Sequence, residues 1–258
     1  MIDTNKINSN NKWKGFKDFL VYKTVKEDGV VTSFYLKSLD GNKLPEFIAG
    51  QFITVRIKNE DNTFTKPRQY TLSMNSNEEF YRISVKREEN GYLSKKLCDE
   101  IKEGDNLQIT APLGNFILKD SEKPLVLIGG GIGITPMLTM AYDAINSNRE
   151  IYFIYSIPNA THHSFRGEIE KLNNNNNFKS TVFYTRPLET EKPGEDFDIK
   201  GRISKEWMIE NLPKDGQFYF CGPVLFMKTV YHNLIAMGIE KENINFEMFE
   251  AGVDITKE

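Results

Sequence analysis

The segment from Gly129 to Pro136 is the strongest chemical motif of the chain. It reads Gly-Gly-Gly-Ile-Gly-Ile-Thr-Pro and stands between a short apolar segment and an amphipathic one. Glycines let the backbone approach a pyrophosphate, Pro136 suits a first helical turn, and a helix N-terminus attracts anions. The motif predicts a dinucleotide-binding turn, although Thr135 and Pro136 depart from the Gly-x-Gly-x-x-Gly pattern. The alternative is a tight turn without a ligand, for which four glycines are more than needed.

A second motif, Cys221-Gly222-Pro223, also follows an apolar segment and precedes a helix. Ligands of open parallel sheets bind beyond the carboxyl ends of the strands, so this motif and the glycine turn are expected to face one crevice. Cys221 would then face that crevice. On its own, the motif would fit a buried structural cysteine better.

A third motif, Arg68-Gln69-Tyr70-Thr71, lies in the first half of the chain. Alone it is weak, because alternating polar and aromatic residues are typical of any exposed barrel strand. Its meaning depends on the other motifs.

The elements that must position these motifs differ between the two halves. Residues 13–20 are either a first strand or a docking segment, and one helix is expected with Ser94 as its N-cap. Short strands are predicted at 30–36, 51–57, 68–73, 81–86 and 106–110. This spacing predicts an antiparallel β-barrel domain over 13–118, followed by a charged hinge at 119–123.

Strands and helices alternate in the second half. We expect strands at 125–128, 151–156, 180–185 and 217–221, and helices at 136–146, 165–173, 205–211 and 225–237. This alternation predicts an α/β doubly wound parallel-sheet domain over 124–258, in which asparagines 173–177 form a surface loop.

Composition excludes several functions. The 258 residues carry a net charge of −3 from 33 basic and 36 acidic residues that are well mixed, so no nucleic-acid partner is expected. Two distant cysteines, Cys98 and Cys221, build no disulfide framework, zinc site or iron–sulfur cluster, and no metal is expected. Residues 1–12 resemble a frayed polar leader, and the longest apolar run, 125–128, is too short to cross a membrane. We therefore expect a cytoplasmic protein without a membrane partner.

Taken in order, the three motifs and the closing Glu247-Met248-Phe249 resemble the ferredoxin-NADP reductase superfamily, in particular the reductase portion of flavohaemoglobins. The stretches 85–89, 91–94 and 201–202 are similar to that portion too. The resemblance covers roughly residues 13–250, and several motifs in the correct order are far more specific than any single one.

The resemblance implies an FAD site in the barrel. Arg68 would meet the FAD pyrophosphate, Tyr70 would stack on the isoalloxazine, and the Thr71 hydroxyl would hydrogen-bond flavin N5. These roles suit a guanidinium fork, an aromatic face and a hydroxyl. The helix N-terminus would supply a second phosphate contact. The remaining residues expected at this site are Phe52, Gln69, Lys86, Gly91, Tyr92, Leu93 and Ser94.

The resemblance also implies an NADH or NADPH site in the second half. Its expected members are Gly130, Gly131, Gly133, Ile134, Thr135, Pro136, Cys221, Gly222 and Pro223, with the nicotinamide near Cys221. Phe249 would shield the flavin until nicotinamide displaces it, and Glu247 would tune the redox potentials. The expected catalytic residues are thus Thr71, Cys221, Glu247 and Phe249. The alternatives for Glu247 and Phe249 are a solvated charge and a packing aromatic.

The sequence departs from the flavohaemoglobin pattern in places. Thr71 replaces a serine, and Phe249-Glu250-Ala251 stands where Phe-Gly-Pro is usual. No globin segment precedes the barrel, so haem is not expected. All three histidines lie in the second half, and His162 and His163 are expected to be exposed loop residues.

These features predict an enzyme that moves a hydride from NADH or NADPH to FAD and passes electrons to a separate acceptor. Candidate acceptors are ferredoxin, flavodoxin, free flavin, a ferric complex, oxygen or a separate haem or iron protein. The alternative is an electron-transfer subunit that works only when docked on a terminal oxidoreductase; a flavin-binding sensor without turnover is a weaker one. A monomer or small homo-oligomer is expected. NADH is slightly favoured, with Ser156 and Arg166 as the candidates for contact with a 2′-phosphate.

Overall fold

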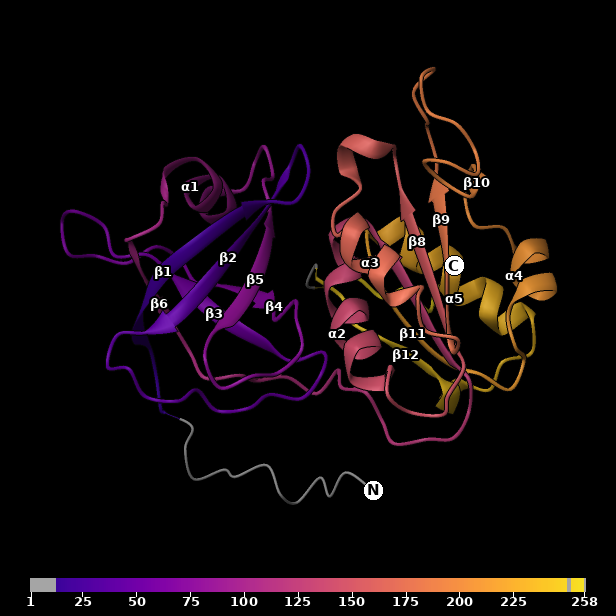
Figure 1. Ribbon diagram of the computed structural model, residues 1–258, viewed down its shortest axis with the longest axis horizontal. Coiled ribbons are helices and arrows are strands. Elements are labelled where there is room, and N and C mark those ends of the chain that lie inside the picture. The colour runs from indigo at the N-terminus through magenta and orange to yellow at the C-terminus, as the bar shows by residue number, and fades with distance from the viewer. Residues whose placement is uncertain (1–12, 250–251, 258) are drawn as a thin grey trace. The chain divides into compact units, whose positions relative to one another are not determined.

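The structure is a computed structural model that describes residues 13–249 and 252–257. It divides into two compact units, Met1–Asp120 and Ser121–Glu258 (Figure 1). The division falls inside the predicted hinge, while the finer domain bounds stay predictions. The predicted leader at 1–12 lies outside the described residues.

The N-terminal unit is the predicted antiparallel barrel. Its six strands lie in the order β4-β3-β6-β1-β2-β5, and every pairing is antiparallel. Beyond β4, the Ser73 N–H donates to the Arg82 carbonyl at 2.9 Å and Leu72 bridges Ile83, which closes the sheet on itself. The strands are β1 Lys17–Lys26, β2 Val31–Ser38, β3 Phe52–Arg56, β4 Arg68–Thr71, β5 Tyr81–Lys86 and β6 Asn106–Ile109.

The barrel core follows the period-2 alternation of its strands. In β3, Ile53 and Val55 are fully buried while their neighbours are half-buried. Leu36 and Ile83 are fully buried on the neighbouring strands β2 and β5. Each such side chain contributes about 1.5–3 kcal/mol by its removal from water. This core fixes the register of β3 and β4. The register in turn decides on which side of the sheet each side chain of the Arg68 motif lies.

One helix, α1 Tyr92–Glu100, belongs to this unit. The predicted N-cap was wrong, because the helix begins three residues earlier than an N-cap at Ser94 implies, with Gly91 as the N-cap and no capping side chain. Ser94 lies inside the first turn, where its hydroxyl accepts a hydrogen bond from the Glu88 N–H at 3.3 Å. The serine therefore ties the preceding loop to the helix instead of capping it.

The C-terminal unit is the predicted parallel sheet. Its six strands lie in the order β10-β9-β8-β7-β11-β12, and all pairings are parallel. The strands are β7 Leu125–Gly130, β8 Ile151–Ile157, β9 Phe178–Tyr184, β10 Ile199–Lys200, β11 Gln217–Cys221 and β12 Ile244–Phe246. The two short edge strands, β10 and β12, were not predicted.

Helices cover both faces of this sheet, as a doubly wound fold requires (Figure 1). They are α2 Ile134–Ala144, α3 Arg166–Leu172, α4 Lys205–Asn211 and α5 Val224–Ala236. A single buried cluster joins Met208 of α4 and Met227 of α5 to Phe183 and Phe220 of the sheet. The sheet order puts β7 beside β11, so the two strands that lead into the glycine turn and Cys-Gly-Pro end side by side.

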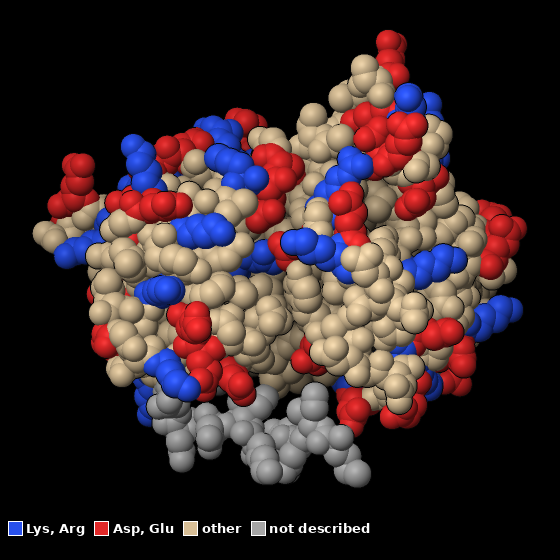
Figure 2. All heavy atoms as spheres, in the orientation of Figure 1, with Lys and Arg blue, Asp and Glu red and all other residues tan. Residues whose placement is uncertain are grey.

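The face seen in Figure 2 mixes acidic and basic side chains without a broad region of one sign. Within the described ranges, no helix is long and apolar enough to span a bilayer. No group of three or more potential metal-ligating side chains is found in the same ranges.

Candidate functional site

Strand β4 presents the Arg68 motif at the barrel surface. Arg68 and Gln69 are exposed, Tyr70 is half-buried and Thr71 is buried. The Arg68 guanidinium donates only to the Pro67 carbonyl, at 3.0 Å, and forms no ion pair in the described part of the chain. An arginine with most of its donors uncommitted can bind an anion, because five N–H groups are available in a rigid fork.

Tyr70 lies against the barrel core and near helix α1. Burial raises the pKa of its phenol, and Cys98 of α1 raises it further. Tyr70 is therefore a neutral ring at physiological pH, and it links the Arg68 motif to the helix.

Phe52 and Thr71 lie opposite each other on β3 and β4. The Thr71 hydroxyl has no hydrogen-bond partner among residues 13–249 and 252–257, so it is available to a ligand. The Phe52 ring lies beside Gly114. A glycine suits this position because its φ is 115° and because a Cβ there would lie 3.0 Å from the ring. The half-buried Phe52 ring is thus held from one side.

The N-terminus of α1 is the second anion-attracting feature of the barrel. The helix has no acidic residue in its first turn, and Tyr92 is 64% exposed. Gly91 is required here because a Cβ would overlap the Ser94 hydroxyl. Lys86 is less available than predicted, because it pairs with Glu88 at 2.6 Å. An open helix N-terminus and an uncommitted arginine on one barrel fit the pyrophosphate of FAD.

In the C-terminal unit, the glycine turn runs from β7 through a 3₁₀ turn, Gly131–Gly133, into α2. Each glycine has a different reason to lack a side chain. A Cβ on Gly129 would lie 2.8 Å from Ile134 Cα, and one on Gly130 would lie 2.9 Å from the Phe226 ring. Gly131 has a φ of 53° and open space around it. Of these three glycines, only Gly131 has open space at its Cβ position, whereas the other two are held by packing inside the unit.

Gly133 joins the two nucleotide motifs. A Cβ on Gly133 would lie 2.6 Å from Gly222 N and closer still to the Cys221 carbonyl. Cys221 also pairs with Gly129 across β11 and β7. The glycine turn and Cys-Gly-Pro thus touch through backbone atoms at the carboxyl edge of the sheet, where parallel sheets bind ligands.

The remaining residues of the turn make internal contacts. Ile134 and Pro136 are buried in the first turn of α2, and the Thr135 hydroxyl donates to the Ile132 carbonyl at 3.0 Å. Only main-chain N–H groups of this turn are left for an anion, which fits a pyrophosphate at a helix N-terminus.

Cys221 is fully buried at the end of β11. Burial raises the pKa of its thiol well above the ordinary value, and Glu247 raises it further. Cys221 is therefore a neutral thiol, unlike the activated thiolate of a nucleophilic cysteine.

Glu247 and Phe249 follow the edge strand β12. Burial raises the pKa of the half-buried Glu247 carboxyl to about 7, and its influence on Cys221 shows that the two groups lie near each other. Phe249 is 48% exposed. The structure thus brings Glu247 close to the Cys221 motif, whereas Glu250 and Ala251 lie outside the described residues.

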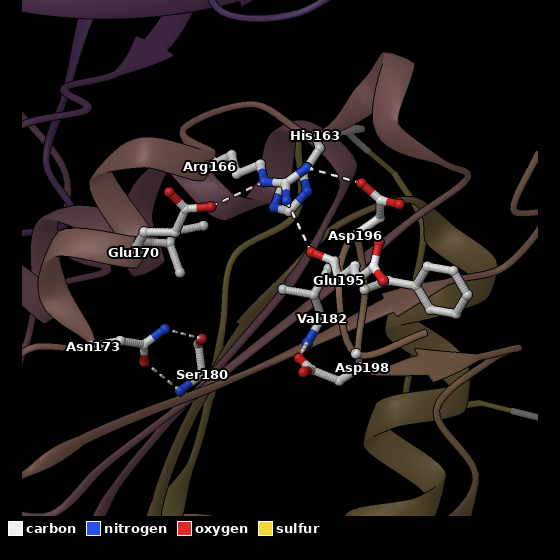
Figure 3. Close-up of a pocket in the computed structure, with 12 residues that line it drawn as sticks. His163, Arg166, Glu170, Asn173, Ser180, Val182, Glu195, Asp196 and Asp198 are labelled. Atoms are coloured by element: carbon white, nitrogen blue, oxygen red, sulfur yellow. Dashed lines mark hydrogen bonds and ion pairs between the residues drawn. The ribbon is translucent and has the colours of Figure 1, made fainter. Parts of the chain in front are cut away.

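The two residues expected at a 2′-phosphate lie on opposite faces of the sheet. Ser156 pairs with Phe183, which belongs to the core beneath α4 and α5, whereas Arg166 lines a hollow with Val182 on the other face. Arg166 contacts Glu170 at 3.0 Å, Asp196 at 3.3 Å and the Glu195 carbonyl at 3.0 Å (Figure 3).

His163 was wrongly expected to be exposed. Its side chain is 8% exposed, lies between the rings of Tyr155 and Tyr184, and shares a 2.8 Å hydrogen bond with the Tyr184 hydroxyl. His162 is half-buried. Phe226, three residues after Pro223, also packs on the Cys-Gly-Pro motif, a contact that the sequence did not predict.

Comparisons with known proteins agree with this arrangement. Residues 22–117 match the oxidoreductase FAD-binding domain family, and residues 127–232 match the oxidoreductase NAD-binding domain family. A flavohemoprotein of Bacillus cereus (strain ATCC 10987 / NRS 248) is 43% identical over 247 residues, which cover 92% of this chain and 61% of that protein. The chain thus spans about three-fifths of the length of the curated relatives that it matches.

Solved structures are similar over nearly the whole chain. The flavohem-like FAD/NAD-binding domain of nitric oxide dioxygenase from Vibrio cholerae O1 biovar El Tor has a TM-score of 0.82 and 33% identity, over 90% of this chain and 98% of that one. A flavohemoglobin from Malassezia yamatoensis, with bound FAD and heme, has a TM-score of 0.79 and 27% identity, over 91% and 60%. The chain therefore belongs to the ferredoxin-NADP reductase superfamily, as an NAD(P)H-dependent flavin oxidoreductase of the kind that forms the reductase portion of flavohaemoproteins.

Proposed function

We propose that this chain oxidises NADH with FAD as its prosthetic group and delivers the electrons to a separate acceptor. The observation that carries the proposal is the contact of Gly133 with the backbone of Cys221 and Gly222, at the ligand-binding edge of a parallel sheet. Bound FAD supplies the redox chemistry, since it accepts a hydride and releases electrons one at a time.

The barrel residues bind and orient the flavin in this proposal. Arg68 and the N–H groups at the start of α1 hold the pyrophosphate, for which both are electrostatically suited. Tyr70 and Phe52 offer aromatic surfaces to the isoalloxazine. Thr71, whose hydroxyl has no partner in the described part of the chain, would hydrogen-bond flavin N5.

The sheet residues orient the nucleotide. The Gly131 backbone and the α2 N-terminus would hold its pyrophosphate. The Cys221 thiol, fully buried and neutral, would lie in the strand end next to the nicotinamide without adding a charge. Glu247 can hold or release a proton near neutral pH, because its pKa is raised to about 7. Phe249, which is 48% exposed and lies three residues after β12, is an aromatic ring available to shield a flavin. Positioning of this kind supplies most of the rate in hydride transfer.

We favour NADH over NADPH because Arg166 is engaged. Two carboxylates and one carbonyl accept hydrogen bonds from three of its five N–H groups, so a 2′-phosphate would have to compete with these partners. Arg186, exposed just after β9, is the cation to examine if NADPH proves the better donor. Its main-chain N–H donates to the Pro158 carbonyl, which places the residue next to the end of β8. The measurement is kcat/KM for each nucleotide, and a ratio in favour of NADPH contradicts the preference.

The acceptor is proposed by class: a ferredoxin, a flavodoxin, free flavin, a ferric complex, or a separate haem or iron protein. Cytochrome c, free flavin and ferric citrate can each be offered to the NADH-reduced protein, and the fastest reoxidation identifies the class. Reoxidation only after addition of a purified partner would favour the electron-transfer subunit. A cytoplasmic location and the oligomeric state stay predictions.

The decisive experiment is a visible spectrum of the purified protein, followed by anaerobic titration with NADH. We expect a flavin band at about 450 nm that bleaches with one equivalent of NADH. A colourless protein that does not take up added FAD contradicts the proposal.

A further inference from the structure

The first turn of α5 places an aromatic ring over the ends of the two central strands. Helical side chains point back toward the helix N-terminus, so Phe226, the third residue of α5, is directed at the end of β11. Its ring atoms lie 2.6 Å from the position of a Gly222 Cβ and 2.9 Å from that of a Gly130 Cβ. The ring therefore rests directly on both glycines.

The Phe226 ring explains why positions 130 and 222 are both glycine. Gly130 ends β7, and Gly222 follows Cys221, so they stand side by side where neighbouring parallel strands end. Any side chain at either position would collide with the Phe226 ring, and a Cβ on Gly222 would also lie 3.1 Å from Gly130 Cα. Both are glycines because the ring needs the space, whether or not a ligand does.

We propose that Phe226 is a positioning residue for the dinucleotide: its ring forms the surface over the strand ends against which the nicotinamide half lies, and it holds the Cys221-Gly222 turn in place. This inference rests on the proposed function. The ring is half-buried and packs on the core beneath α5, so it is held by the core and still partly exposed. Loss of such a support shifts the reacting atoms, and a misplacement of about 1 Å costs about 100-fold in rate.

The test is a double-mutant cycle in thermal stability and nucleotide binding. Gly222→Ala is expected to lower Tm by about 3–10 °C, because the new methyl group meets an aromatic ring and backbone. In the Phe226→Ala background the same change is expected to lower Tm by at most about 2 °C, because the ring is gone and only the 3.1 Å approach to Gly130 Cα remains. Gly167→Ala is the matched control, since no atom lies within 4 Å of its Cβ position. Equal Tm losses for Gly222→Ala in both backgrounds overturn the explanation of the glycines.

The positioning role is tested separately. Phe226→Ala is expected to weaken NAD⁺ binding, measured by isothermal titration calorimetry, by about 10-fold and to slow flavin reduction by about 10- to 100-fold, with FAD content unchanged. Phe226→Leu, which keeps an apolar support, is expected to recover part of the NAD⁺ affinity and part of the reduction rate. This variant replaces Phe226→Ala in the test if the alanine variant does not fold. Wild-type NAD⁺ affinity and reduction rate in both variants overturn the proposal. A wild-type protein without flavin or without NADH oxidation would instead refute the proposed function.

Discussion

Replacing Gly133 by alanine adds one methyl group where the glycine turn meets the strand that carries Cys221. Gly133 has φ −63° and ψ −3°, a conformation that alanine adopts without strain, so the effect is purely steric. The new Cβ would lie 2.6 Å from Gly222 N, whereas ordinary contact begins at 3.4 Å. The obstacle is backbone, which has no rotamer by which to yield.

The turn or the strand end must therefore move by about 1 Å, which costs about 1–3 kcal/mol in a packed interior and lowers Tm by about 3–10 °C. Because Cys221 moves with it, flavin reduction by NADH is expected to slow by about 100-fold. Differential scanning fluorimetry and anaerobic stopped-flow absorbance measure the two effects. FAD content is expected to stay at the wild-type level, because the change lies outside the barrel unit.

Gly167→Ala again serves as the control, and it is expected to match or exceed the wild-type Tm because alanine is favoured inside a helix. The reasoning is refuted if Gly133→Ala keeps its Tm within about 1 °C and its reduction rate within about twofold of wild type.

Three further predictions concern single side chains. Arg68→Ala is expected to weaken FAD binding by about 10- to 100-fold through loss of charged hydrogen bonds to phosphate, measured as FAD retained on gel filtration; full retention contradicts the assignment. Cys221→Ala is expected to slow flavin reduction while FAD stays bound, and an unchanged reduction rate would remove the thiol from the site. Burial raises the pKa of Glu247 from 4.5 to about 7, so the folded state loses stability as pH rises from 4.5 to 7. Glu247→Gln is therefore expected to be more stable than wild type at pH 8, by about 1–2 kcal/mol after solvent screening, and equal to it at pH 4; a pH-independent difference in Tm contradicts the burial argument.

The architecture could be predicted from the sequence because its signals are local. Short alternating strands in one half and alternating strands and helices in the other were both confirmed, and three segments, β5, β11 and α4, had their ends where expected. Edge strands β10 and β12 were missed because two or three residues carry no periodicity. Their existence depends on the neighbouring strand, which sequence patterns do not reveal.

The site was less predictable, because the same residue type serves different contacts. Four glycines in one turn indicated a ligand, yet only the structure distinguishes Gly131, which is open, from Gly133, which packs on backbone. Ser94 looked like a cap, although its hydroxyl binds a preceding loop. His163 looked exposed because its burial depends on Tyr184, 21 residues away.

The backbone contact at Gly133 also limits how the protein can be redesigned. Since the glycine turn and Cys221 touch without an intervening side chain, no rotamer can absorb a change at either one, and the two respond as one rigid piece. Attempts to change the preference for NADH or NADPH should therefore target the carboxyl ends of β8 and β9, around Ser156 and Arg186. Arg186 is exposed, so atoms added there meet water, and the thiol stays where it is.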